Sequence, residues 1–199
     1  PSTAVVTREL HAGIIGMAKR DWSRQLLQQL AIPEDVLTPE AFSAGWAAHM
    51  ALRYDELQLM PGAAELVATL QRRGVPMAIA TSSDRKQCEA KIAVHAATLR
   101  EPMGAVVCGD EVPRGKPHPD IFLAAAEKLG VAPERCVVVE DSPYGAQAGV
   151  AAGMVAVFVP DARFMDEAAL SRVPAEARRV GALSDVASVL DQLTAGATA

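Results

Sequence analysis

Short, continuous apolar runs alternate with helical segments after Gly62, and this alternation is what most narrows the possible folds. The runs cover residues 75–80, 105–108, 136–139 and 155–159, with a further strand expected near 179–183. A run that is apolar at every position indicates a strand buried on both faces, because a strand with one wet face alternates apolar and polar residues. Helices between such strands are the crossovers of a parallel sheet. We therefore predict an α/β fold with a doubly wound, parallel, Rossmann-like sheet.

The stretch before this alternation has a different pattern. Apolar residues recur at helical spacing between Trp22 and Leu30, a second helix is predicted over residues 39–52, and no run of β-branched residues appears. A Met-Pro-Gly turn signal then precedes the change of pattern. The sequence therefore predicts two parts, a small all-helical domain over residues 1–56 and an α/β domain over residues 57–199.

Composition excludes several classes of function. The net charge of −5 argues against nucleic-acid binding, which needs clustered Lys and Arg. No apolar run approaches the roughly 20 residues of a membrane span, and no secretory signal is visible. The three cysteines are odd in number and form no C-x-x-C pair, so we expect small core residues rather than disulfides or a zinc site. We expect a cytoplasmic monomer.

Polar residues follow three of the predicted strands, directly after the first and third and a few residues after the second. They are Thr81-Ser82-Ser83, Gly115-Lys116-Pro117 and Glu140-Asp141-Ser142. In a doubly wound sheet, ligands bind at the carboxyl ends of the strands, so these groups are expected to meet at one edge.

The three groups together suit a phosphate. Hydroxyls and backbone N–H groups at a helix start bind phosphate oxygens, a lysine opposes the dianion, and adjacent carboxylates bind Mg²⁺. Each group alone has a plain structural explanation, as a helix cap, a surface turn or a solvated turn. Their occurrence after three successive strands favours a site of phosphoryl transfer, where positioning and charge neutralisation do most of the catalysis.

These segments, with their order along the chain, resemble the haloacid dehalogenase superfamily. The likeness runs from about Gly13 to Asp161, and the helical stretch before Met60-Pro61-Gly62 resembles the small helical cap of one branch of that superfamily. Within the superfamily the pattern is nearest to the pseudouridine-5′-phosphate phosphatases and related small-metabolite phosphatases. The blocks that carry the likeness are Ile79–Ser83, Gly109–Val112, Arg114–Phe122, Val138–Gly145 and Ala151–Met154.

The resemblance implies a role for each matching position. Thr81 would bind the transferring phosphoryl group through its hydroxyl, helped by the amide of Ser82. Lys116 would bridge that group and the nucleophile. Asp141 would bind Mg²⁺ directly, with Glu140 beside it.

The resemblance also implies that the helical cap faces the substrate. Lys19 or Arg20 would make that contact. The expected ligand is a small phosphorylated metabolite.

One motif of the superfamily has no counterpart in this chain. Such enzymes open with a strand that ends in D-x-D, whose first Asp attacks phosphorus to form an aspartyl-phosphate, and no D-x-D occurs here. By resemblance that strand would precede Pro1 and would lie centrally, between the strand ending at Thr81 and the strand ending at Glu140. We therefore expect the first central strand to be missing, with either a slot at that place or another segment filling it, and no phosphatase activity from this chain.

The leading interpretation is a Mg²⁺-dependent phosphomonoesterase of small phosphorylated metabolites. A sugar phosphate mutase of the same superfamily shares the motifs and stays open. A non-catalytic phosphate-binding or regulatory module is the alternative of another class. Its best-known form, the phosphoreceiver, places its acids before Thr and Lys, whereas here Thr81 and Lys116 come before Glu140 and Asp141.

Overall fold

The fold comes from a computed structural model, which describes residues 5–17 and 19–196. The side chains of residues 8, 19, 20 and 196 lie outside the described part. The helices are α1 Arg8–Ala12, α2 Lys19–Gln29, α3 Pro39–Ala51, α4 Ala63–Arg72, α5 Arg85–Val94, α6 Ala96–Leu99, α7 Asp120–Leu129, α8 Pro143–Ala151, α9 Glu167–Leu170 and α10 Val186–Gly196. None of these helices is long and apolar enough to cross a membrane.

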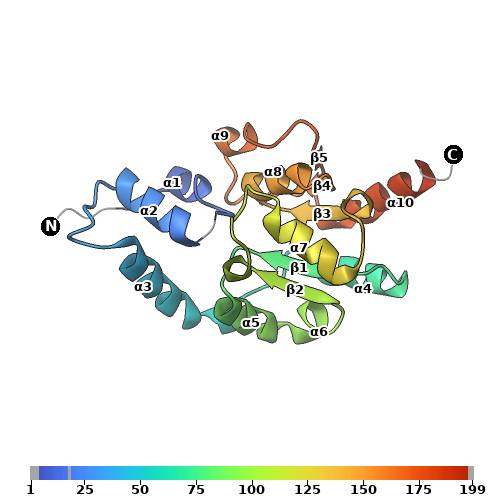
Figure 1. The fold of residues 1–199 in the computed structure, drawn as a ribbon, viewed down its shortest axis with the longest axis horizontal. Coiled ribbons are helices and arrows are strands. Elements are labelled where there is room, and N and C mark those ends of the chain that lie inside the picture. Colours follow the sequence, from blue (N-terminus) through green and yellow to red (C-terminus); the bar gives the residue numbers. More distant parts are fainter. Residues whose placement is uncertain (1–4, 18, 197–199) are drawn as a thin grey trace.

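All strand pairs of the described residues are parallel, as the continuous apolar runs predict. The strands are β1 Ala78–Thr81, β2 Ala105–Cys108, β3 Val137–Glu140, β4 Val155–Phe158 and β5 Arg178–Arg179. The first two pair with each other, and the last three form a second sheet in the order β3-β4-β5. The α/β class and the parallel, doubly wound arrangement are therefore confirmed (Figure 1).

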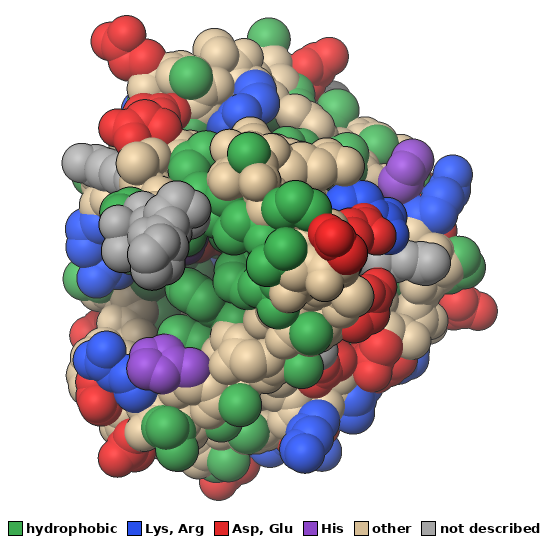
Figure 2. Space-filling model, turned by 90° about the vertical axis from the view of Figure 1, so that its left-hand side faces the viewer, with side chains coloured by type: hydrophobic (Ala, Val, Ile, Leu, Met, Phe, Trp, Pro, Cys, Tyr) green, Lys and Arg blue, Asp and Glu red, His purple; other side chains and the backbone are tan. Residues whose placement is uncertain are grey.

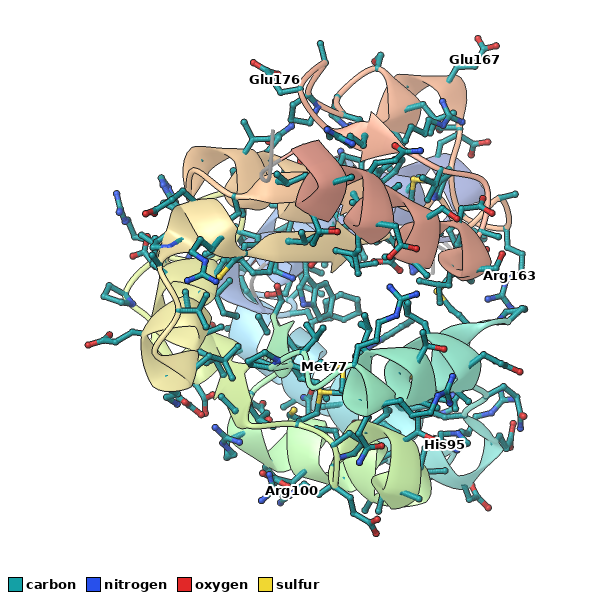
Figure 3. The ribbon with its side chains drawn as sticks, turned by 90° about the vertical axis from the view of Figure 1, so that its right-hand side faces the viewer. Met77, His95, Arg100, Arg163, Glu167 and Glu176 are labelled. Carbon is teal, nitrogen blue, oxygen red and sulfur yellow. The ribbon has the colours of Figure 1, made fainter. Side chains whose placement is uncertain are left out.

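The two sheets meet at a break between β1 and β3. In the described part of the chain these two strands share no backbone pairing, although they face each other across the middle of the molecule (Figure 1). Figure 3 shows the upper and lower halves separated, with Met77, the residue before β1, in the middle of the view. The break has a visible consequence in β3, where Val139 is 38% exposed although its neighbour Val138 is 5% exposed. The break lies where the resemblance implied a slot.

Helices cover both faces of the two sheets and join them. On one face α7 packs on β1 and β2, and α8 packs on β3 and β4. A single apolar cluster runs through this layer and includes Val107, Ile121, Val138 and Ala148, so it spans both sheets. On the other face α5 covers β2, while α4 and α10 cover β4. Side-chain packing therefore holds together two sheets that lack a shared backbone ladder.

Glycines allow the close approach of α8 to the sheet. A Cβ on Gly149 would lie 3.1 Å from the Val138 side chain and 3.3 Å from that of Ala156, tighter than most real contacts. Gly153 serves a different purpose, because it has a φ of +73° just past the helix end and nothing near its Cβ position. Left-handed backbone of this kind suits glycine and ends helices.

The described residues before β1 form helices and no strand, as predicted. Helices α1 to α3 lie at one end of the molecule (Figure 1), and Figure 2 shows hydrophobic side chains gathered around a hollow on that end. Helix α1 also packs on the rest of the chain, because Ala12 belongs to an apolar cluster with Ala146 and Phe158. The separation of residues 1–56 as a cap therefore stays a proposal.

Two segments differ from expectation in detail. The helical segment between the apolar runs at 75–80 and 105–108 breaks at His95 into α5 and α6, and the ring Nε2 of His95 lies 2.8 Å from the carbonyl oxygen of Leu57. This contact with a residue distant in the sequence takes the place of a continuous helix through His95. The strand expected near 179–183 is only two residues long.

Candidate active site

The predicted site residues meet in one pocket of about 360 Å³ at the carboxyl ends of β1 and β3. Thr81 ends β1, Glu140 ends β3, and Lys116 lies in the loop before α7. The pocket lining also includes Ile15 and Gly16 of the segment between α1 and α2, so the helical region contributes a wall. The lining residues that the sequence singled out are Thr81, Ser82, Lys116, Glu140 and Asp141.

Lys116 spans the break between the two sheets. Its Nζ donates a hydrogen bond of 3.2 Å to the carbonyl oxygen of Ala80 in β1 and forms an ion pair with Glu140 of β3. The residue is 7% exposed, and its Nζ lies 5.0 Å from the centroid of the Phe122 ring. A buried ammonium is stable only when such partners replace its water. Lys116 therefore presents one fixed positive charge at the meeting point of β1 and β3.

Both carboxylate oxygens of Glu140 are already engaged. One pairs with Lys116, and the other accepts hydrogen bonds from the hydroxyl and the backbone N–H of Ser142, at 3.0 and 3.4 Å. Ser142 is itself the N-cap of α8, because its hydroxyl accepts from the N–H of Gly145 at 3.0 Å. The carboxylate lies so close to α8 that a Cβ on Gly145 would be 2.0 Å from it. Glu140 thus orients Lys116, and its metal-binding role stays an untested prediction.

The hydroxyl cluster after β1 lies on the other side of the pocket. Thr81 Oγ1 accepts a hydrogen bond of 3.2 Å from the N–H of Ser83, which points the hydroxyl across the start of the loop. Ser82 Oγ donates to the carbonyl oxygen of Gly16 at 2.9 Å. Gly16 has a φ of +86°, and a Cβ there would lie 2.3 Å from the hydroxyl of Ser142. Only glycine lets the segment from α1 approach the pocket this closely.

Asp141 is the carboxylate with room for a cation. The side chain keeps contact with solvent, yet the surrounding protein removes part of its hydration. This desolvation, followed by the negative charge of Glu140, raises the pKa of Asp141. A bound Mg²⁺ would relieve both effects, and Mg²⁺ ordinarily binds one or two carboxylates with water and substrate phosphate completing its shell. The donor set therefore fits a magnesium ion held by Asp141 together with a phosphate.

Two further groups of predicted or candidate residues lie elsewhere. Lys19 and Arg20 begin α2, but their side chains are outside the described residues. In the described residues, one group of acidic and thiol side chains has metal-like spacing, formed by Cys108, Asp110 and Glu111. Glu111 there pairs with Arg85 and Lys128, which already neutralise it. That group is therefore an ion-pair network rather than a second metal centre.

Sequence reasoning missed two residues of the site. A turn with a helix cap was weighed for the segment that contains Ser142, but its hydrogen bonds to the Glu140 carboxylate were not expected. They had no signal in the sequence beyond the two residues being close along the chain. The positioning role of Gly16 had no sequence signal, because it depends on contact with residues about 126 positions away.

Several known proteins are similar to this chain. A family profile described as "haloacid dehalogenase-like hydrolase" matches residues 3–153. A protein of Drosophila melanogaster named "Probable pseudouridine-5'-phosphatase" is 37% identical over 164 residues, which cover 80% of this chain and 69% of that protein. "Hexitol phosphatase A" of Escherichia coli is 35% identical over 135 residues, or 68% of this chain and 56% of that protein.

A third relative is much longer than the present chain. The "Bifunctional riboflavin kinase/FMN phosphatase" of Arabidopsis thaliana is 35% identical over 147 residues, which cover 74% of this chain and 38% of that protein. The chain thus spans between roughly a third and two thirds of the length of these relatives. Among solved structures, a hydrolase from Pseudomonas syringae has a TM-score of 0.77 at 25% identity, covering 93% of this chain and 82% of that one. The chain belongs to the haloacid dehalogenase-like hydrolase family.

Proposed function

We propose that this chain supplies the phosphoryl-binding and magnesium-binding part of a phosphomonoesterase that acts on small phosphorylated metabolites. The observation that carries the proposal is the convergence of Thr81, Lys116 and Asp141 in one pocket. Relatives are named as phosphatases of pseudouridine 5′-phosphate, hexitol phosphate and FMN, so the shared element is a phosphate ester and the rest of the substrate differs. Cytoplasmic location stays a prediction.

Each residue has a distinct task in this proposal. Thr81, through its hydroxyl, and the backbone N–H of Ser82 bind phosphoryl oxygens, and the N-terminus of α8 adds a favourable dipole. Lys116 opposes the charge that grows on the phosphoryl oxygens when the ester P–O bond breaks, and Glu140 holds the ammonium in place. Asp141 would hold Mg²⁺, which supplies charge neutralisation at the phosphate when bound.

The attacking carboxylate is the part that the described residues do not offer. In the pocket Asp141 is the residue proposed to hold the cation, and Glu140 is bound to Lys116 and Ser142. A carboxylate that coordinates a metal or pairs with a lysine is a poor nucleophile, because its electron density is withdrawn and its direction is fixed. We therefore expect this chain to bind phosphate without turning over esters.

Phosphate binding tests the proposal directly. Titration calorimetry with inorganic phosphate, at fixed Mg²⁺, should show one site in the wild-type chain. Lys116→Met keeps the apolar stem against Phe122 but removes the charge, and should weaken binding by about tenfold or more, since a charge-assisted bond contributes roughly 1.5–3 kcal/mol. Lys128→Met, on the outside of α7, is the matched control and should bind normally. Equal binding by Lys116→Met and wild type would refute the proposal.

A sugar phosphate mutase remains the second candidate. A β-phosphoglucomutase from Clostridium difficile has a TM-score of 0.79 with this chain at 15% identity, which is a likeness of fold alone. The two functions differ in product, because a mutase returns a rearranged sugar phosphate whereas a phosphatase releases inorganic phosphate.

A further inference from the structure

The segment from Ala12 to Gly16, which runs from the end of α1 toward α2, forms one wall of the phosphate pocket. Ile15 and Gly16 line that pocket, and Gly16 has left-handed backbone with a φ of +86°. The last carbonyl groups of a helix have no partner within the helix, so those at the end of α1 need donors from elsewhere. The α/β part of the chain supplies these donors.

Two hydroxyl groups hold the part of this segment that lies nearest the pocket. Ser82, after β1, donates to the carbonyl oxygen of Gly16 at 2.9 Å. Tyr144, near the start of α8, donates to the carbonyl oxygen of Gly13 at 3.5 Å. Both donors therefore come from elements that build the phosphate pocket itself.

Arg172, between α9 and β5, holds the other end of the segment from outside the pocket. Its Nη2 donates to the carbonyl oxygen of Ala12 at 3.3 Å, and the Gln147 side chain donates to the carbonyl oxygen of Arg172 at 2.7 Å. Nε of Arg172 is buried without a hydrogen-bond partner among the described residues, which carries a desolvation cost. No described carboxylate pairs with this guanidinium. Its contact with Ala12, at the carboxyl end of α1 where a cation is favourable, is therefore its stabilising interaction.

A series of contacts leads from Ala12 to the charges in the pocket. The wall touches the start of α8, because a Cβ on Gly16 would lie 2.3 Å from the hydroxyl oxygen of Ser142. The same hydroxyl donates to the Glu140 carboxylate at 3.0 Å, and Glu140 pairs with Lys116. A shift of the wall would therefore press on Ser142 and disturb the carboxylate that orients Lys116.

We propose that Arg172 is a positioning residue for the phosphate pocket, although it does not line that pocket. By holding the carbonyl group of Ala12, it fixes the pocket wall against the start of α8. The fixed wall keeps Glu140 paired with Lys116 in the orientation that binds phosphate. This inference rests on the proposed phosphate site and assigns a further residue to it.

Calorimetry with inorganic phosphate at fixed Mg²⁺ tests the proposal through substitutions of Arg172. Arg172→Met keeps an unbranched apolar stem but removes every donor, and should weaken phosphate binding by about threefold to tenfold, as expected for coupling through intermediate residues. Arg172→Lys keeps the charge and an ammonium donor, and should bind phosphate with an affinity between those of Arg172→Met and the wild type. Arg179→Met, at an exposed position of β5, is the matched control and should bind phosphate as the wild type does.

A double-mutant cycle with Lys116→Met separates positioning from a general effect on folding. If Arg172 acts through Lys116, Arg172→Met should have no further effect on phosphate affinity in the Lys116→Met background. If circular dichroism shows that Arg172→Met does not fold, Arg172→Lys carries the same cycle. Wild-type affinity in the Arg172 variant used, or a loss that adds to that of Lys116→Met, would overturn the role of Arg172 while leaving the phosphate site intact. A wild-type chain that binds no phosphate would instead show that the proposed function is wrong, and this inference with it.

Discussion

At the scale of single residues, Lys116 joins two strands that share no backbone pairing in the described chain. Its contacts with Ala80 and Glu140 place one charge at the break. The geometry depends on small residues nearby, because Glu140 can reach Lys116 only where α8 has no side chain at Gly145.

Gly145→Ala tests that dependence. A Cβ would lie 2.0 Å from the Glu140 carboxylate, so the carboxylate must shift and its pair with buried Lys116 is weakened. We expect a loss of roughly 1–3 kcal/mol in the free energy of unfolding, together with weaker phosphate binding by calorimetry. Gly45→Ala in α3 is the matched control, because nothing lies within 4 Å of its Cβ position. A glycine-to-alanine change inside a helix should stabilise by about 0.5–1 kcal/mol, so equal effects of the two changes would contradict this account.

The buried thiol of Cys108 leads us to expect that the folded protein loses stability at alkaline pH. Burial, followed by a hydrogen bond with Cys88, raises the pKa of Cys108 to about 12 from an ordinary value of 9.0. Between these values the unfolded thiol releases its proton and the folded one keeps it. The free energy of unfolding should therefore fall as pH rises above 9, by up to about 1.4 kcal/mol per pH unit.

Denaturant unfolding of the wild type and Cys108→Ala between pH 8 and 11 measures how much of the pH dependence of the free energy of unfolding comes from Cys108. The variant should have a shallower pH dependence, while Cys136→Ala, at a partly exposed thiol, should behave more like the wild type. Parallel curves for wild type and Cys108→Ala would show that the thiol keeps its ordinary pKa.

At the scale of elements, the break between β1 and β3 leads us to expect different stability costs for truncating two adjacent valines of β3. Val138 is 5% exposed against α7 and α8, whereas Val139 is 38% exposed on the opposite face of the same strand. Val138→Ala removes two buried methyl groups, at roughly 0.8 kcal/mol each plus a cavity cost, so it should cost about 1.5–3 kcal/mol, whereas Val139→Ala should cost less than about 1 kcal/mol. Chemical denaturation of the two variants measures both costs. A cost at Val139 equal to that at Val138 would mean that the space beside β3 is filled.

The elements also show how far the sequence could predict the fold. Apolar runs located β1 to β4, because continuous burial on both faces leaves a clear signal in the residues themselves. The break of the helix at His95 and the shortness of β5 left no such signal, since both depend on contacts with distant residues. The packing of α1 on β4 through Ala12 and Phe158 was missed for the same reason.

The same distinction applies to the site. Thr81, Lys116 and Asp141 could be placed in one pocket because each follows a parallel strand that points to the same edge. The pairing of Glu140 with Lys116 could not, because spacing of 24 residues along the chain says nothing about which carboxylate an ammonium will choose. A second pocket, lined by Trp22, Trp46 and Lys91 among others, was also missed, since it forms only where α3 lies against α5.

At the scale of the whole molecule, we propose that the chain builds a phosphoryl-binding pocket of the haloacid dehalogenase type, and that its described residues leave that pocket without a free attacking carboxylate. Turnover of a generic ester, p-nitrophenyl phosphate with Mg²⁺, tests this claim most directly. The assay compares the 199-residue chain with one extended at its N-terminus by a strand that carries D-x-D. We predict release of inorganic phosphate by the extended chain and none above background by the 199-residue chain; equal turnover by both would contradict the assignment of the nucleophile and the mechanism that depends on it.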